Sequence, residues 1–184
     1  SKYDWSTGAY NQVFRVHPDW QGKVIADLNF ELPAHAHNTQ DAIRCTYEYA
    51  DFIRQFTDSL TVPKEAYPDG ITVLSPIETW SDDFSMAIAG IPSTVNDFSA
   101  GPFMQNYYHS QYDNQDVYQE AVYQFHHECY LKLIMAIDRL VLPPMNFSNT
   151  MNAVTESIRE NALSFADPEQ NVLLRNLQLS LIHI

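Results

Sequence analysis

Apolar runs and helically spaced apolar positions alternate along the first part of this chain. Apolar residues at helical spacing predict a helix over residues 5–14. After a turn that contains Pro and Gly, residues 23–30 form an apolar run too short for an independent helix, which predicts a buried strand. Residues 43–46 alternate like a further strand. The helix predicted to follow has its apolar positions at Tyr49, Phe52, Ile53 and Phe56.

The middle of the chain predicts a loop, a short helix and another strand. Residues 57–80 are predicted to be a loop-rich connection, because turn-forming residues recur in it at Pro63, Pro68, Gly70 and Pro76. Ser81 or Asp82 is a good N-cap for a short helix, since its side-chain oxygen can accept a hydrogen bond from a free backbone N–H group. Gly90 fits the position that ends this helix, and residues 91–98 are the next predicted strand.

The last third of the chain is predominantly helical in pattern. A long helix is predicted over residues 117–142, and Pro143 and Pro144 end it. Its apolar side comprises Val122, Phe125, Cys129, Leu133, Ala136 and Leu140. Residues 147–178 give further helical pattern. Together these elements predict an α/β fold.

Composition and charge narrow the class of protein. Hydrophobic residues make up 45% of the 184 residues and charged residues 18%, which is typical of a globular chain. The formal net charge of −13 argues against a nucleic-acid partner, because phosphate binding needs clustered Lys and Arg. No apolar run approaches the roughly 18 residues that a membrane span needs. Cys45 and Cys129 are predicted to be small buried hydrophobic residues and not a disulfide.

Two positions have the chemistry of metal ligands. Asp27 places a carboxylate inside an apolar run, which is costly unless the group is hydrogen-bonded, paired or bound to a metal. His109 follows two tyrosines in a loop, and imidazole is the commonest metal ligand among side chains. Each has a structural alternative. Asp27 could accept hydrogen bonds from a neighbouring loop, and His109 could be a loop histidine bonded to Asp113.

Three motifs, in this order, resemble a known family. They are Asp27 in its apolar run, Ser81-Asp82-Asp83 followed by Gly90-Ile91-Pro92-Ser93, and Tyr108-His109-Ser110-x-x-Asp113. The set resembles the C-terminal half of the zinc-dependent exopeptidases that include aminopeptidases, glutamate carboxypeptidase and the transferrin receptor. The middle motif departs from the family pattern, because Asp83 stands where His is usual.

The resemblance implies a centre with two zinc ions that hydrolyses peptide bonds with metal-activated water. Asp27 and His109 would each serve a different zinc ion, and the Tyr108 hydroxyl would donate to the developing oxyanion. Asp82 would orient ligands or cap a helix without binding metal itself. Packing of its ring at the base of the loop is the alternative for Tyr108. His35 and His37 match no ligand of the family and are expected to line a pocket or to be solvated.

The resemblance also implies a mixed, mostly parallel sheet flanked by helices, and it predicts how the chain is organised. Residues 1–144 would be the second half of a peptidase domain, and residues 145–178 the start of a helical region through which a homodimer could form. The remaining metal ligands and the general base would lie before Ser1, so this chain alone is expected to be inactive. Residues 179–184 match what a transposase adapter encodes and are expected to be a sequencing tail, the alternative being an ordinary apolar helix end.

A peptide substrate is the expected partner, and its side-chain preference stays open. The arginine cluster that selects a C-terminal glutamate in glutamate carboxypeptidase is absent from residues 91–98. The alternative function is a non-catalytic binding or scaffold domain of the same fold, as in the transferrin receptor. The sequence does not indicate the cellular compartment.

Overall fold

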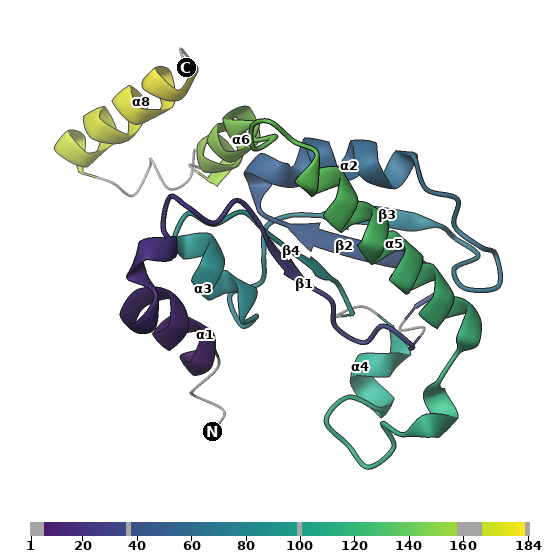
Figure 1. The fold of residues 1–184 in the computed structure, drawn as a ribbon. Helices are drawn as coiled ribbons and strands as arrows, with labels where there is room; N and C mark the ends of the chain where they lie inside the picture. Colours follow the sequence, from purple (N-terminus) through teal and green to yellow (C-terminus); the bar gives the residue numbers. More distant parts are fainter. Residues whose placement is uncertain (1–5, 36–37, 99–100, 158–166, 183–184) are drawn as a thin grey trace.

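A mixed four-stranded sheet flanked by helices forms the centre of this computed structural model (Figure 1). The structure describes residues 6–35, 38–98, 101–157 and 167–182. The strands are β1 (Asp27–Asn29), β2 (Asp41–Cys45), β3 (Ile71–Leu74) and β4 (Ser93–Asn96). Their order in the sheet is β1-β4-β2-β3, with β1 parallel to β4, β2 parallel to β3, and β2 antiparallel to β4. The predicted α/β class with a mixed sheet is therefore confirmed.

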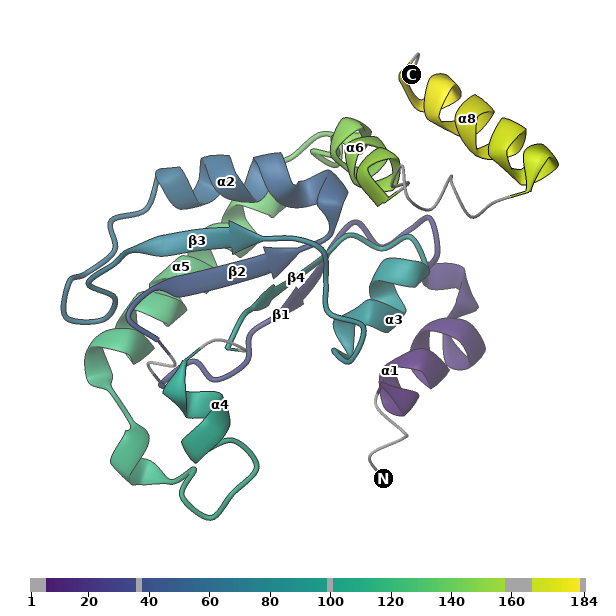
Figure 2. The ribbon, with the colours of Figure 1, turned by 180° about the vertical axis from the view of Figure 1, so that it is seen from behind.

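The main apolar core lies between the sheet and two helices. Helix α5 (Glu120–Asp138) crosses one face of the sheet, and α2 (Ala50–Asp58) follows a 3-10 turn at Tyr47–Tyr49. Figure 2, from behind, shows α5 on the far side of the strands. The predicted apolar side of the long helix is confirmed. Its fully buried members that join the core are Val122, Phe125, Cys129 and Leu133.

Strand β1 is shorter than the sequence predicted. The backbone N–H groups of Lys23 and Val24 both bond to the carbonyl of Trp20, so a turn takes up the start of the predicted run. Asp27 is therefore the first residue of β1. Within the described residues β1 is an edge strand, with β4 on one side and no strand on the other.

The sequence missed β3 altogether. This strand lies inside the predicted loop 57–80, where four residues between turn signals give too short a pattern to stand out. Gly70 precedes it with φ 80°, a conformation that L side chains rarely adopt, and its carbonyl accepts a hydrogen bond from Asp41 N at 2.9 Å. Pairing with β2, and not the local sequence, defines this strand.

Helix α3 (Asp83–Ile88) forms where a short helix was predicted. Gly90 ends it with φ 78°, and its N–H bonds to the carbonyl of Ala87 at 3.0 Å. Asp82 occupies the N-cap position but makes no capping side-chain hydrogen bond. The Ser81 hydroxyl instead donates to the carboxylate of Asp83, so the polar groups at this helix start are directed toward another carboxylate.

The remaining helices lie around the ends of the sheet. Near the N-terminus, α1 (Thr7–Asn11) continues into a π-helical turn over Gln12–Val16, and a 3-10 turn covers Pro18–Trp20. Helix α4 (Pro102–Asn106) and a 3-10 turn at Gln115–Val117 lie before α5, and α6 (Phe147–Ser157) and α8 (Pro168–Ile182) follow it. Helix α6 lies in the region predicted to be helical, whereas α8 begins in it and continues past residue 178 to Ile182. Among the described residues, no helix is long and apolar enough to cross a membrane.

Candidate functional site

A pocket lies beside the carboxyl ends of β1 and β4, where ligand sites of open α/β sheets commonly lie. Its space of about 520 Å³ includes volume that is open to solvent. Its walls come from β2, from the end of β4 and from the segments that follow β1, β3 and α4. The lining residues are Glu31, Arg44, Glu78, Trp80, Ser81, Asp82, Val95, Asn96, Asp97, Phe98 and Tyr108.

The carboxyl group of Asp27 is largely buried, and one of its oxygens, Oδ2, has no hydrogen-bond partner among the described residues. The backbone of Asp27 pairs with Ser93 of β4. Burial raises the pKa of Asp27 to about 7, and the charge of Asp83 and a hydrogen bond with it act in the same direction. A hydrogen bond with Ser93 opposes the shift. A carboxyl group in this state gains free energy from a cation placed beside it.

Asp83 and Asn29 connect Asp27 to the pocket. Asp83 is buried and accepts hydrogen bonds from the Ser81 hydroxyl and from Asn29 Nδ2, the latter at 3.2 Å. The same Asn29 amide donates to Glu31 Oε1 at 2.9 Å. Asp83 was recognised in the sequence only as a departure from the family motif, yet it is the residue that approaches Asp27.

Glu31 was not among the predicted site residues, although it belongs to the same polar row. Asp27, Asn29 and Glu31 recur at intervals of two, the spacing that puts strand side chains on one face. Burial raises the pKa of Glu31, and the charges of Asp83 and Asp82 raise it further. The hydrogen bond from Asn29 and the charge of His109 oppose this shift, so His109 lies within electrostatic reach of Glu31.

Tyr108 and His109 lie at the mouth of the pocket. Their rings stack with centroids 3.9 Å apart, and Tyr108 also packs against Phe98 at 5.2 Å. Burial raises the pKa of the Tyr108 phenol, as do the charges of Glu31 and Asp82, so this hydroxyl stays protonated and able to donate. His109 is exposed and has φ 54°, a strained left-handed backbone conformation for a side chain of this size.

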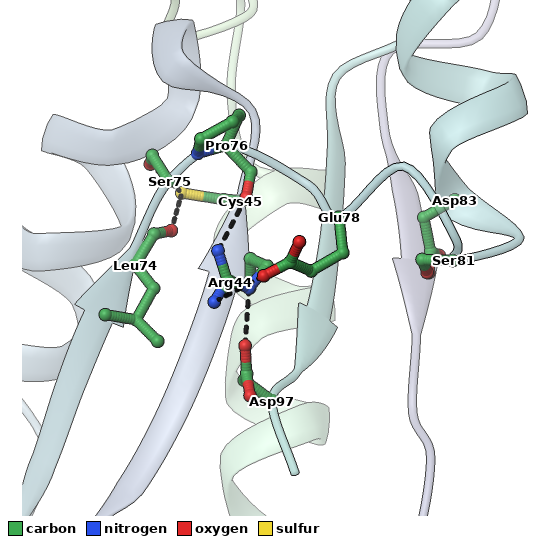
Figure 3. Close-up of polar contacts among 9 residues, drawn as sticks. All are labelled: Arg44, Cys45, Leu74, Ser75, Pro76, Glu78, Ser81, Asp83 and Asp97. Atoms are coloured by element: carbon green, nitrogen blue, oxygen red, sulfur yellow. Dashed lines mark hydrogen bonds and ion pairs between the residues drawn. The ribbon is translucent and has the colours of Figure 1, made fainter. Parts of the chain in front are cut away.

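Arg44 is anchored on one side of the pocket by three separate groups (Figure 3). Its Nε donates to the carboxylate of Asp97, and its two terminal nitrogens reach the Pro76 carbonyl at 2.9 Å and Glu78 Oε1 at 3.1 Å. Its guanidinium is therefore already engaged at all three nitrogens. No local pattern indicated this arrangement, because the Pro76 carbonyl and Asp97 lie 32 and 53 positions from Arg44 in the sequence.

Several histidines and both cysteines lie outside this pocket. Asp113 Oδ1 lies 3.5 Å from Nδ1 of His35, and His37 lies outside the described residues. His126 and His127 face different sides of α5, one buried and the other exposed. Both cysteines are buried and free, and burial raises the pKa of Cys45 to about 11, so its thiol is not an activated nucleophile.

The four predicted site residues are thus linked to one acidic group around the pocket. Asp82 and Tyr108 line it, His109 acts on Glu31, and Asp27 is joined to it through Asp83 and Asn29. Within the described ranges, no three His, Cys, Asp or Glu side chains are placed to hold a metal ion among themselves. Among the described residues, at most two such side chains are therefore placed to bind the same metal ion.

Comparison with known proteins gives no relative for this chain. No protein-family model matches it, and neither the curated proteins nor the solved structures contain a significant match. The arrangement of side chains around the pocket is therefore the basis for a functional argument.

Proposed function

We propose that this chain supplies part of a two-zinc exopeptidase centre, with Asp27 and His109 as metal ligands. The observation that carries the proposal is the gathering of Asp27, Asp82, Tyr108 and His109 around Glu31 and Asp83. These residues come from three separate parts of the sequence. The family resemblance assigns four of them, Asp27, Asp82, Tyr108 and His109, to the site.

The surroundings of Asp27 fit a metal ion. Its Oδ2 is buried without a hydrogen-bond partner among the described residues, and the neighbouring Asp83 adds a like charge instead of a counter-charge. Carboxylate oxygen and imidazole nitrogen are ordinary ligands of zinc. When bound, zinc would act as a Lewis acid on a peptide carbonyl.

The other residues have roles that their positions favour. Tyr108 lines the pocket, and its protonated hydroxyl would donate to the oxygen on which negative charge develops. Asp82, exposed at the pocket edge, would orient neighbouring groups electrostatically, as its effect on Glu31 and Tyr108 indicates. Asp83 and Asn29 would hold Asp27 in place.

Zinc titration by calorimetry tests the proposal. We expect this chain to bind zinc weakly, because it contains only part of the expected ligand set, and to hydrolyse no peptide. Asp27→Asn and His109→Ala should each lower the affinity at least about tenfold. His127→Ala is the matched control, because it removes an exposed histidine from α5, away from the pocket.

The outcomes separate the two candidate functions. Equal zinc affinity in all four proteins, or no binding at all, would contradict the metal site and favour a non-catalytic binding domain. Turnover by a longer protein that contains this chain, lost on Asp27→Asn, would support the peptidase. Chelator-sensitive turnover by this chain alone would instead direct attention to Glu31, Glu78 and Asp83 as bases.

A further inference from the structure

Apolar and aromatic side chains form much of the lining of the pocket beside Arg44. Its buried floor comes from the end of β4, with Val95 and Phe98 providing apolar surface. Trp80 and Tyr108 add two further aromatic rings to the lining. Such a surface favours an apolar chain or a flat delocalised group over a small hydrated ion.

Arg44 is not available to a negatively charged ligand. Its three guanidinium nitrogens are engaged by Asp97, Glu78 and the Pro76 carbonyl (Figure 3). An acidic side chain entering the pocket would have to displace one of these partners. The pocket therefore lacks the free guanidinium fork that recognition of a carboxylate commonly uses.

The charges of the lining residues favour a positively charged ligand. Glu31, Glu78, Asp82 and Asp97 contribute four carboxylates, and Arg44 is the one cation among the lining residues. Arg44 already pairs with Asp97 and Glu78, so the lining residues supply no further cation to Glu31 and Asp82. Outside the lining, the charge of His109 acts on Glu31. In addition to burial, the charges of Glu31 and Asp82 raise the pKa of the Tyr108 phenol, which lines the same pocket.

We propose that this pocket binds the basic side chain of a peptide, with the alkyl stem of Lys or Arg against Phe98, Trp80 and Tyr108 and its cationic head near Glu31 and Asp82. Cations are attracted to the faces of aromatic rings, and the stems of Lys and Arg pack well on apolar surface. This inference rests on the proposed peptidase function, because it assigns the side-chain preference of the same site. It requires no metal.

A set of four small ligands, titrated into the wild-type chain and followed by calorimetry or NMR, tests the inference. N-acetylarginine amide carries only the side-chain cation, N-acetylnorleucine amide carries neither cation, and norleucine amide carries only the α-amine. N-acetylglutamate amide is the acidic probe. We expect N-acetylarginine amide to bind at least about tenfold more tightly than each of the others, with an affinity that falls as salt rises.

Two charge-removing variants locate the site. Asp82→Asn and Glu31→Gln preserve size and should each weaken N-acetylarginine amide binding several-fold. Asp138→Asn is the matched control, because it removes an exposed carboxylate at the end of α5 and should leave binding unchanged. Equal weakening by all three variants would show a general charge effect and overturn the assignment of the pocket.

The ligand series also distinguishes this inference from the proposed function. If N-acetylnorleucine amide binds as well as N-acetylarginine amide, or if norleucine amide alone binds, the basic side-chain preference is wrong. Zinc binding that depends on Asp27 would then still support the metal site. If N-acetylarginine amide binds selectively while zinc does not bind, the pocket is a recognition site and the peptidase proposal fails.

Discussion

Two groups of buried acidic and polar side chains lie in this molecule, and they are satisfied in opposite ways. In the core, His126 of α5 lies between three partners. Its Nε2 is 3.1 Å from the Tyr67 hydroxyl and 3.4 Å from Asp41 Oδ1, and its Nδ1 is 3.2 Å from the Pro33 carbonyl. Beside the pocket, Asp27 faces another carboxylate and has a buried oxygen without a described partner.

The difference separates a structural group from a candidate binding group. All three side chains of the core group are nearly inaccessible, and both ring nitrogens of His126 lie within hydrogen-bonding distance of a polar partner. Such a network stabilises the fold as it stands. The Asp27 group stores unfavourable charge interactions that a cation would relieve. Residue type alone does not distinguish them, because both contain aspartate near histidine or tyrosine.

Replacing His126 should produce the largest effect. His126→Ala leaves the Asp41 carboxylate buried without its histidine and opens a cavity, so we expect a loss of about 3–5 kcal/mol in the free energy of unfolding. Urea denaturation measures it. His127→Ala, on the exposed side of the same helix, should change stability by less than about 0.5 kcal/mol. Similar losses in both variants would remove the distinction between the two groups.

The pH dependence of stability should come from Asp27 in the group beside the pocket. The pKa of Asp27 rises from 3.8 to about 7 on folding, so between these values the folded chain binds more protons than the unfolded chain. Stability should therefore fall as pH rises from about 4 to 7, by about 2 kcal/mol after allowance for partial exposure and coupling. Asp27→Asn should flatten this part of the profile. A profile that stays steep in Asp27→Asn would assign the effect to another group.

The hydrogen bond at the start of α3 should have a smaller effect. Ser81→Ala removes the hydroxyl that donates to the buried Asp83 carboxylate, and we expect a loss of about 1–2 kcal/mol above pH 7. Ser81→Thr keeps the donor and should restore most of this loss. Failure of threonine to restore stability would indicate that packing, and not the hydrogen bond, holds Ser81 in place.

The strained backbone of His109 should give the smallest change, and a stabilising one. His109→Gly relieves the left-handed conformation at φ 54°, so thermal denaturation should show a gain of about 0.5–1 kcal/mol. The same variant should lose zinc affinity. A destabilised His109→Gly would mean that the imidazole contributes to the fold, which would bring it closer to the core group in character.

The sequence predicted the parts of the fold that depend on local periodicity. The apolar side of α5 and the glycine that ends α3 were both predicted correctly. Helical spacing of apolar residues and a glycine at a positive φ are features of only a few neighbouring residues. Strand β3 and the true start of β1 were not. Their limits are set by pairing with distant strands and by the turn at Trp20, which a window of neighbouring residues does not contain.

The candidate site was predictable only in part for the same reason. Asp27, Asp82, Tyr108 and His109 were selected through a resemblance of motifs. Glu31 and Asn29 could have been found from the polar row that Asp27 starts, since it has the period of a strand. The approach of Asp83 to Asp27 and the triple engagement of Arg44 depend on tertiary contacts, and no local pattern in this sequence indicated them.

Histidine ring resonances followed by NMR during zinc titration test the central distinction most directly. We expect zinc at pH 7.5 to shift or broaden the ring signals of His109, because its imidazole is exposed beside the acidic group. The signals of His126 should stay unchanged, since both ring nitrogens are already engaged in the core. Equal perturbation of both histidines, or no effect on His109, would contradict the account.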